Sequence, residues 1–236
     1  MSMGTQQAIS EREIAAWADR FEGSEVEEVL AWAAERFAPR LVMTSNFGAE
    51  GVVLLDHLMR VAPRTPIVYL NTGFQFGETD ELKERLRERY DMNLIEARAA
   101  LSVEEQERVH GPQLYARDAD LCCRLRKVEP LRDALQGCSA WIAALRRDQS
   151  PTRASIRAVE WNLRHALLKL HPLAAWTRRQ VWDYILQHRL PYNRLYDEGY
   201  ASIGCRPCTR PVAAGAHERS GRWDGSRKQE CGIHLS

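Results

Sequence analysis

The stretch LVMTSNFGAEGVVLLDHLMRV, residues 41–61, decides the fold. It begins with a short apolar run, LVMTSN, passes through the turn FGAEG, and continues as VVLLDHLMRV with apolar residues at helical spacing. This order predicts a strand, a turn and a helix. The segment SNFGAEG joins the strand to the helix, where backbone N–H groups and the helix dipole favour an anion. It is not a Walker A loop, because no G-K-S or G-K-T follows the glycines.

The same unit recurs along the chain. TPIVYLNTG (65–73) is followed by ETDELKERLRERY (78–90), and MNLIEAR (92–98) adds a third strand. AWIAALRR (140–147) and ALLKLHPLAAW (166–176) indicate a fourth and a fifth strand, and the helix RRQVWDYILQH follows the fifth. Alternating strands and helices predict an α/β fold with a mostly parallel five-stranded sheet and flanking helices. Ligands of such sheets gather at the carboxyl ends of the strands.

Two segments flank this α/β region. Residues 1–39 have the pattern of packing helices, because SEREIAAWADRFEG starts at a Ser10 cap and SEVEEVLAWAAERF repeats the pattern from Ser24. Residues 40–200 form the α/β domain. Residues 201–236 comprise the C-x-x-C segment and a C-terminal tail, rich in Gly, Arg and Pro without periodicity, that we expect to be mobile. We expect the three segments to make one structural domain.

Composition and charge narrow the class of protein. Lys and Arg number 33 against 32 Asp and Glu, a net charge of +1, so no global field attracts nucleic acid or membranes. No apolar leader follows the opening MSMGTQQAIS, and no run approaches a membrane-spanning length, so we expect a cytoplasmic protein. Six cysteines in a reducing compartment indicate metal ligands or catalytic thiols rather than disulfides. A homo-oligomer remains open.

Four of the cysteines have a pattern typical of a metal site. Cys122 and Cys123 are adjacent in LCCRLRK, and Cys205 and Cys208 form a C-x-x-C in IGCRPCTRP. Zinc commonly takes four such ligands, but adjacent side chains point apart and fit one tetrahedral ion poorly. A four-iron cluster offers one corner to each thiolate and suits the pattern better. Cys138, in LQGCSAW, has no such partner and is expected to be a small core or turn residue.

Three polar loops follow predicted strands and should meet at one edge of the sheet. They are SNFGAEG, LNTGFQFGET and LRRDQSPTR, and each carries glycine or arginine. In the last loop, Arg146, Arg147 and Arg153 could each hold a phosphate or sulfate group through two hydrogen bonds. The alternative is a solvated surface loop.

A single cysteine, Cys231, lies near the end of the chain in RKQECGIHLS, between Lys228 and His234. A thiol on a terminus can be incidental, because termini tolerate change. It becomes a nucleophile where nearby cations lower its pKa and a partner site exists. The other motifs therefore decide its role.

Seven motifs together resemble a known family. They run in order from about residue 40 to residue 234: SNFGAEG, LNTG, the double cysteine followed by RKVEPL, LRRDQSPTR, PYNRLYDEGYASIGCRPCTRP, HERSGRW and ECGIH. The series is similar to the assimilatory sulfonucleotide reductases, and above all to the iron–sulfur adenylylsulfate reductases that depend on thioredoxin. The resemblance implies a Rossmann-like nucleotide-binding fold of the ATP-pyrophosphatase type over residues 40–200.

The resemblance also implies a cofactor and a reaction. A [4Fe-4S] cluster would be bound by Cys122, Cys123, Cys205 and Cys208, and Cys231 would attack the sulfur of adenosine 5′-phosphosulfate. AMP would leave, and thioredoxin or a glutaredoxin-like dithiol would release sulfite from the S-sulfocysteine adduct. Because the dithiol supplies both electrons, the cluster would tune local charge without net redox work. A preference for the 3′-phosphorylated substrate, or acceptance of both, is the alternative.

The family pattern carries over to further residues of this sequence. The cations that neutralise the phosphosulfate would be Lys127, Arg153, Arg219 and Arg222. His234 would lie close to the nucleophile. Two nucleotide loops would be lined by Ser45, Gly48, Asn71 and Thr72.

The sequence departs from the family pattern at two places. The first loop has Asn46 and Phe47 where Ser-Phe-Ser-Gly or Ser-Phe-Gln is common, so a hydroxyl that could contact phosphate or ribose is lost. Ala144 stands where glycine is usual, and its methyl group would crowd a nucleotide at that strand end. We expect a slightly reshaped site.

Two other functions are weighed against this one. An ATP-pyrophosphatase of the tRNA-thiolating kind would share the fold, but its first loop resembles S-G-G-x-D-S, which SNFGAEG does not match. A nucleic-acid-binding module with a four-cysteine zinc site would need a basic stripe interleaved with aromatics, and the balanced charge disfavours one. We therefore expect no nucleic-acid and no membrane partner.

Overall fold

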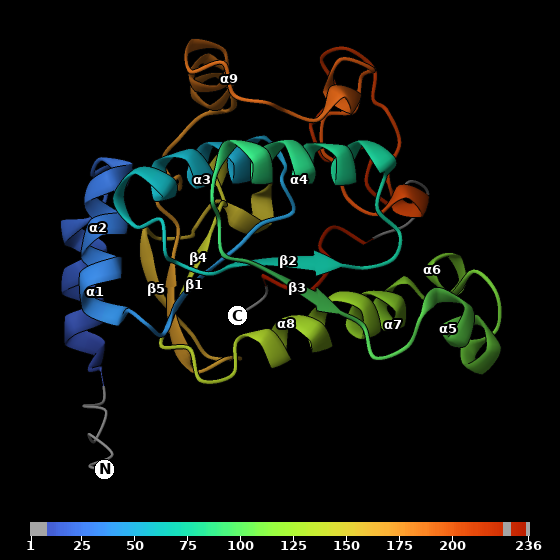
Figure 1. Ribbon diagram of the computed structural model, residues 1–236, viewed down its shortest axis with the longest axis horizontal. Coiled ribbons are helices and arrows are strands. Elements are labelled where there is room, and N and C mark those ends of the chain that lie inside the picture. Colours follow the sequence, from blue (N-terminus) through green and yellow to red (C-terminus); the bar gives the residue numbers. More distant parts are fainter. Residues whose placement is uncertain (1–8, 224–227, 235–236) are drawn as a thin grey trace.

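The computed structural model describes residues 9–223 and 228–234 (Figure 1). Its strands are β1 (Leu41–Thr44), β2 (Ile67–Asn71), β3 (Leu94–Arg98), β4 (Ala140–Ala143), β5 (Val159–Asn162) and β6 (Leu167–Leu170). The longer helices are α1 (Glu11–Arg20), α2 (Val26–Phe37), α3 (Ala49–Val61), α4 (Gly77–Arg89), α5 (Val103–His110) and α9 (Arg178–Gln187). Shorter helical segments are α6 (Leu114–Arg117), α7 (Ala119–Cys123), the π-helical turn η1 (Arg124–Val128), α8 (Glu129–Ala134), and the 3₁₀ turns η2 (Arg147–Gln149), η3 (Pro151–Arg153), η4 (Arg194–Tyr196) and η5 (Arg206–Cys208).

The strands form one sheet in the order β3-β2-β1-β4-β6-β5, and all neighbours are parallel except β5 and β6. The predicted α/β class with a mostly parallel sheet is confirmed. The sequence predicted five strands, and the strand it missed is β5, which pairs antiparallel with β6 at the edge. Its four residues, VEWN, are too few and too mixed in polarity to give a periodic signal.

The order of the strands also locates the site. The chain passes from β1 to β2 on one side, whereas β4 pairs with β1 on the other side. The connection after β1 therefore leads to one side of the sheet, toward β2, and the connection after β4 leads to the other side, toward β5 and β6. In open α/β sheets, ligands bind outside the carboxyl ends of the strands at such a point.

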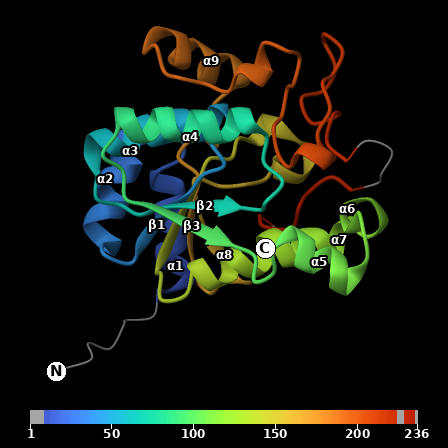
Figure 2. The same ribbon diagram turned by 45° about the vertical axis from the view of Figure 1, so that its right-hand side comes forward.

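Alternating side chains along the strands build a core on each face of the sheet. Leu41 and Met43 of β1 face the larger core, which includes residues of α1, α2, α3 and α9, whereas Val42 faces the smaller one. Trp141 of β4 lies on the same side as Val42, together with Leu131 of α8. This period of two is the period of a pleated strand. Figures 1 and 2 show α3 and α4 over one face of the sheet and α8 over the other.

The two N-terminal helices begin differently. Ser10 caps α1 as predicted: its hydroxyl accepts from the Glu13 N–H at 3.3 Å, and the Glu13 carboxylate accepts from the Ser10 N–H at 2.9 Å. Helix α2 starts one residue later than its pattern suggested, with Glu25 at the cap position. Ser24 instead donates to the Arg20 carbonyl at 3.2 Å and closes the end of α1.

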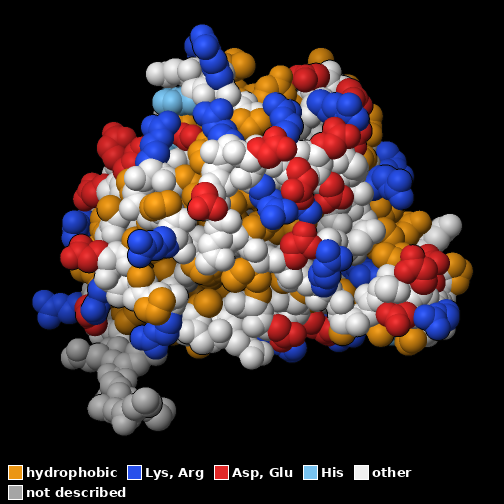
Figure 3. Space-filling model, in the orientation of Figure 1, with side chains coloured by type: hydrophobic (Ala, Val, Ile, Leu, Met, Phe, Trp, Pro, Cys, Tyr) orange, Lys and Arg blue, Asp and Glu red, His pale blue; other side chains and the backbone are white. Residues whose placement is uncertain are grey.

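Side chains of both charges are interspersed over the face shown in Figure 3. Over residues 9–223 and 228–234, no helix has both the length and the apolar character that crossing a bilayer requires.

Candidate active site

A cavity lies at the carboxyl ends of β1, β2 and β4. Its walls come from the loops after these strands, from the C-x-x-C segment and from the C-terminal tail. It is lined by ten of the predicted site residues: Ser45, Gly48, Thr72, Lys127, Arg153, Cys205, Arg219, Arg222, Cys231 and His234. The fold thus gathers the predicted loops, cations and tail cysteine at one place.

The first loop is a tight turn with a strained residue. The Ser45 hydroxyl accepts a hydrogen bond from the Phe47 N–H at 3.0 Å, and Phe47 has a positive φ of 54°. Such a backbone conformation is uncommon for a residue other than glycine. The Phe47 ring is buried, with its centroid 5.3 Å from that of Tyr69. Packing of this ring therefore helps to hold the turn.

Asn46 supplies polar groups next to Phe47, the position where the Ser-Phe-Ser-Gly pattern would place a hydroxyl. Its Oδ1 accepts from the Gly48 N–H at 3.2 Å, and its Nδ2 donates to the Ile203 carbonyl at 3.4 Å. The first departure thus ties the loop to the segment just before the C-x-x-C. Ala144, the second departure, lines the cavity, as the expected crowding requires.

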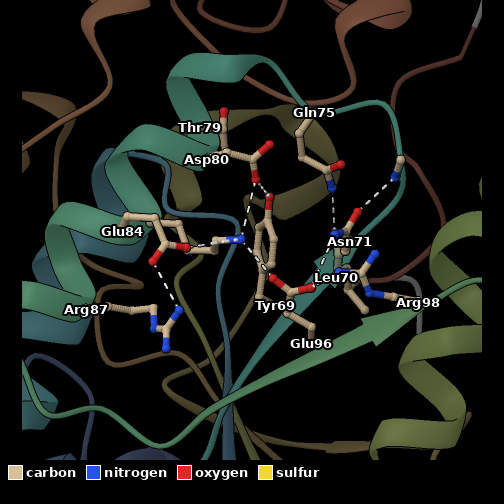
Figure 4. Close-up of polar contacts among 12 residues, drawn as sticks. Tyr69, Leu70, Asn71, Gln75, Thr79, Asp80, Glu84, Arg87, Glu96 and Arg98 are labelled. Carbon is tan, nitrogen blue, oxygen red and sulfur yellow. Dashed lines mark hydrogen bonds and ion pairs between the residues drawn. The ribbon is translucent and has the colours of Figure 1, made fainter.

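The second loop separates two residues that the family pattern groups together. Thr72 lines the cavity, and its hydroxyl lies 3.3 Å from the Cys205 sulfur. Asn71 does not line it, because its amide is used locally: Nδ2 donates to Glu96 at 3.3 Å and Oδ1 accepts from the Gly73 N–H at 3.1 Å. Figure 4 shows Asn71 among these polar contacts near Glu96 and Arg98. Asn71 therefore shapes the turn and does not reach the cavity.

The three arginines of the third loop also divide. The Arg146 side chain is 0% exposed and does not line the cavity, because carboxylates surround its guanidinium group. These carboxylates are Glu50, Glu218 and Asp148. Arg147 forms an ion pair with Glu22 at 2.6 Å and also lies outside the cavity. Arg146 and Arg147 are therefore structural ion pairs in this fold, and Arg153 alone of the three faces the cavity.

Cys231 is half-buried in this cavity, where opposing effects act on its thiol. Burial alone would raise its pKa, but Lys127, the Ile233 backbone N–H and Arg222 outweigh burial and hold the pKa below the ordinary value. A thiol with a lowered pKa has more of the nucleophilic thiolate form at neutral pH. The predicted nucleophile therefore has the electrostatic setting that a nucleophile needs.

The tail is fastened on both sides of Cys231. Glu230 accepts from Arg153 at two positions, each at 2.9 Å, and from Arg219 at 3.0 Å. The Gly232 carbonyl accepts from Arg164 at 2.7 Å. Glu230 was not among the predicted site residues, although the ECGIH motif places its carboxylate next to the nucleophile.

His234 also lines the cavity. Its ring stacks on Trp141 with centroids 5.6 Å apart and planes 16° from parallel, and its carbonyl accepts from the Lys169 ammonium group at 3.3 Å. Burial, reinforced by Lys169 and Arg153, holds the pKa of His234 well below its usual range. His234 is therefore neutral at pH 7 and close to the nucleophile in sequence and space.

The four predicted ligand cysteines meet at a second, smaller cavity. Cys122 and Cys123 end α7 and are buried, Cys205 directly precedes η5, and Cys208 is the last residue of η5. All four line this cavity. Lys127 lies on the π-helical turn η1, directly after α7, and lines both cavities.

The groups around this second cavity suit a bound metal cluster with negative charge: the thiols could be its ligands, and Arg126 could donate hydrogen bonds to it. Burial raises the pKa of Cys122 to about 11 and that of Cys123 to about 12. Arg126 faces the same cavity, and its buried Nε and Nη2 have no hydrogen-bond partner among the described residues. Over residues 9–223 and 228–234, no three His, Cys, Asp or Glu side chains converge on a single ion. Thiols around a cavity, with unpartnered donors facing them, match a cluster whose corners take one ligand each.

Cys138 lies apart from both sets of thiols. It is half-buried beside the smaller core and lines neither cavity. This position agrees with its expected place as a core or turn residue.

A glycine connects the C-x-x-C segment to one of the cavity cations. A Cβ atom built on Gly204 would lie 2.2 Å from Nη2 of Arg222, so no side chain fits there while the guanidinium keeps its place. Gly204 directly precedes Cys205. Thr209, just beyond the C-x-x-C, forms an isolated antiparallel β-bridge with the backbone of Arg222. The segment that carries two predicted ligands thus supports Arg222.

Comparison with known proteins agrees with this arrangement. The model of the phosphoadenosine phosphosulfate reductase domain matches residues 40–211. A phosphoadenosine 5′-phosphosulfate reductase of Gloeobacter violaceus is 47% identical over 99% of this chain and 96% of its own length. An adenosine 5′-phosphosulfate reductase of Halalkalibacterium halodurans is 46% identical over 88% of this chain and 90% of its own.

Solved structures show the same fold. The phosphoadenylyl-sulfate reductase of Candida auris, in a phosphate complex, has a TM-score of 0.77 at 29% identity and covers 88% of this chain and 100% of its own. The FMN adenylyltransferase of Candida glabrata has a TM-score of 0.56 at 17% identity, covering 87% and 70%, and shows the fold alone. The predicted nucleotide-binding fold is confirmed. With its motifs, its cavity and these relatives in agreement, the chain belongs to the sulfonucleotide reductase family.

Proposed function

We propose that this protein is an adenylylsulfate reductase that converts adenosine 5′-phosphosulfate to sulfite and AMP. The Cys231 thiolate attacks the sulfur atom, the S–O bond to the phosphate breaks, and AMP leaves with the bonding electron pair. A dithiol protein such as thioredoxin or a glutaredoxin-like partner then attacks the S-sulfocysteine, and its two thiols supply the two electrons that release sulfite.

One observation carries this proposal: the thiol of Cys231 shares a cavity at the carboxyl ends of the strands with four cations. These cations are Lys127, Arg153, Arg219 and Arg222. A phosphosulfate carries negative charge on both of its groups, and the leaving phosphate gains more as the S–O bond breaks. Fixed cations at this position lower the energy of that transition state. The reaction also requires reduced thiols, which supports the cytoplasm as the compartment.

We propose that Cys122, Cys123, Cys205 and Cys208 bind a [4Fe-4S] cluster. When bound, the cluster would supply local charge beside Lys127 and no net electrons. The support comes from the thiols that line one cavity and from the unpartnered donors of Arg126 that face it. Lys127 joins this cavity to that of Cys231, because it lines both.

Adenylylsulfate rather than its 3′-phosphorylated form is the proposed substrate. The relatives bear both names, so they do not decide between the two. Glu50 and Glu218 also line the cavity, and because they share the single positive charge of Arg146, the three groups together keep net negative charge there. They would oppose the additional charge of a 3′-phosphate, which is about −1.5 to −2 at neutral pH.

Steady-state rates with both nucleotides, each freed of the other, test the choice. We expect a kcat/KM at least roughly tenfold higher for adenylylsulfate, about 1.4 kcal/mol of transition-state binding. Equal values would indicate a dual-specificity enzyme. A preference for the 3′-phosphorylated nucleotide would contradict the proposal and leave the family assignment intact.

A further inference from the structure

We propose that Phe74 and Tyr115 form an aromatic cover over the cysteine cavity, the smaller cavity lined by the four predicted ligand cysteines. The cover keeps water, dioxygen and chelators away from these thiols and from the metal that they bind. This inference rests on the proposed function only for the identity of that metal as a [4Fe-4S] cluster. It gives a protective role to two residues that carry no thiol and do not line the cavity of Cys231.

The two rings meet beside the thiols. Phe74 lies in the loop after β2 and Tyr115 lies on α6, and their ring centroids are 5.5 Å apart with the planes 79° from parallel. This edge-to-face arrangement is favourable for aromatic pairs. Both residues line the cysteine cavity and are also partly exposed, whereas Cys122 and Cys123 are only 6% and 7% exposed. The two rings therefore form part of the wall between buried thiols and solvent.

The backbone ties Phe74 to the segment that carries two of the predicted ligands. Its carbonyl accepts from the Arg206 N–H at 2.7 Å. Arg206 lies between Cys205 and Cys208 in the sequence. On the other side, the Phe74 N–H donates to the Thr72 hydroxyl at 3.2 Å, and this hydroxyl lies 3.3 Å from the Cys205 sulfur. The position of the Phe74 ring is therefore fixed relative to the C-x-x-C segment.

The Phe74 ring also contacts Arg126. The guanidinium group lies 5.4 Å from the ring centroid, a cation–π contact, and its Nη1 donates to the Leu101 carbonyl at 3.1 Å. The Nε and Nη2 atoms are buried and have no hydrogen-bond partner among the described residues. Buried donors are rarely left unsatisfied. A ring that keeps water from these donors leaves them available to a group bound by the thiols.

The rest of the wall is also unsuited to water. Apart from the thiols and two cations, the cavity is lined by aromatic and aliphatic groups, and besides the two rings of the cover these belong to Ala119, Pro207 and Trp223. A buried water molecule needs two to four polar partners, which such a wall does not offer. Removal of one ring would therefore replace an apolar wall by an opening to solvent.

A second aromatic pair provides an internal control. The rings of Phe76 and Tyr200 are also 5.5 Å apart, with planes 75° from parallel. Neither residue lines the cysteine cavity or the cavity of Cys231. Tyr200→Ala thus removes a comparable aromatic contact and leaves the cover intact.

The central test measures how fast the bound metal leaves the full-length protein. Iron or zinc released to an excess of chelator is followed by the absorbance of the chelate, and bleaching in air by visible absorption. Tyr115→Ala and Phe74→Leu should release metal roughly tenfold and threefold faster than the wild type, because the opened wall admits the chelator. Tyr115→Phe keeps the ring and should stay within about twofold of the wild type, as should Tyr200→Ala. If Tyr115→Ala does not fold, Phe74→Leu against Tyr115→Phe carries the same comparison.

A second measurement does not depend on the identity of the metal. Each protein is treated with a maleimide without denaturant, and modified peptides are quantified by mass spectrometry. Tyr115→Ala should raise the rate of modification at Cys122 and Cys123 roughly tenfold, because the reagent reaches them more often. Cys231 lies in the other cavity and is the internal reference, so its rate should change by less than about twofold.

The outcomes separate failure of the cover from failure of the proposed function. Equal metal release and equal modification in the wild type and Tyr115→Ala would overturn the cover, even if the wild type is brown. Equal acceleration in Tyr200→Ala would also overturn it, because general loosening of the fold would then be the cause. A wild type with zinc or without metal would remove the proposed cluster, and release of that zinc or modification of Cys122 and Cys123 would still decide on the cover.

Discussion

Lys127 lowers the pKa of both Cys123 and Cys231, yet the net shifts of the two pKa values have opposite signs. Burial raises the pKa of Cys123 to about 12, and Lys127 opposes this only in part. At Cys231 the effect of burial is overcome by Lys127, the Ile233 N–H and Arg222, so its pKa is lowered. The two thiols therefore differ in the balance between burial and positive groups, because Lys127 and Lys228 do not offset burial at Cys123.

This difference separates two kinds of chemistry in adjacent cavities. A buried thiol with a high pKa stays protonated unless a metal replaces the proton, which suits a ligand. A thiol whose pKa is lowered by cations has a larger thiolate fraction at neutral pH, which suits a nucleophile. Lys127 lines both cavities. Burial alone would lower its pKa, but Cys205 and Cys231 raise the pKa above the ordinary value, so Lys127 stays protonated at neutral pH. The comparison can be tested by changing one member at a time.

The largest effect is expected for Cys231→Ser. Turnover should fall by roughly 10³-fold or more, because a serine hydroxyl is far less nucleophilic at neutral pH. Iron content and nucleotide binding should persist. Mass spectrometry of the wild type, given substrate without reductant, should show one sulfonate on Cys231 that thioredoxin releases as sulfite. An adduct on another cysteine, or sulfite production by the variant, would refute the assignment.

The next largest effect is expected for Cys123→Ser, which should lose the cluster and activity together. Purified wild type should be brown, with about four iron and four sulfide per chain. Visible absorption and iron analysis check both proteins. Cys138→Ser is the matched control and should keep its iron, because Cys138 lines neither cavity. Colourless wild type with one tightly bound zinc would contradict the cluster assignment.

Lys127→Met tests a cation that lines both cavities. The kcat should fall by roughly 10²-fold, because the charge beside the leaving phosphate is lost. Lys127→Arg should recover part of the rate. Iron content, measured in parallel, should stay within about twofold of the wild type, since no cysteine ligand is changed. Loss of iron in step with activity would mean that Lys127 serves mainly the cysteine cavity.

The smallest effect concerns Lys169, a buried lysine that lines neither cavity. Burial, with help from Arg153, lowers its pKa to about 8. The unfolded chain then binds the extra proton between about pH 8 and pH 10.4, so stability rises with pH in that window. Relative to Lys169→Met, the wild type should gain roughly 1–3 kcal/mol in free energy of unfolding from pH 8 to pH 10. Denaturant titrations at both pH values check this, and a parallel pH dependence in the variant would show that other groups titrate instead.

Local patterns in the sequence were sufficient for most of the fold. The strands β1, β2, β3, β4 and β6 carry apolar runs next to helical periodicity, and Ser10 begins a helix with a capping box. The strand β5 was missed because its partner, β6, rather than its own four residues, holds it in the sheet. Ser24 could not be distinguished from a cap by residue type alone, since its hydroxyl serves the end of the preceding helix.

The site was less predictable where partners are distant in sequence. Arginine in a loop suggests an anion, but only the fold shows that Arg146 already faces carboxylates from α3 and the tail region. Glu230 stands in a recognisable motif, yet its role depends on Arg153, 77 residues away. The Asn71 side chain accepts a hydrogen bond within its own turn, from the Gly73 N–H. Motifs therefore identify the groups, and long-range pairing decides which of them remain free.

The close approach of Gly204 to Arg222 has an evolutionary consequence. An alanine at this position would displace the end of a flexible side chain and no backbone atom, so the protein would fold with little penalty. The displaced guanidinium group, however, is the one beside the thiol. A substitution at residue 204 would therefore reduce turnover and hardly change stability, so selection at this position would act through turnover. Gly204 would then be conserved together with Arg222, the cation 18 positions later.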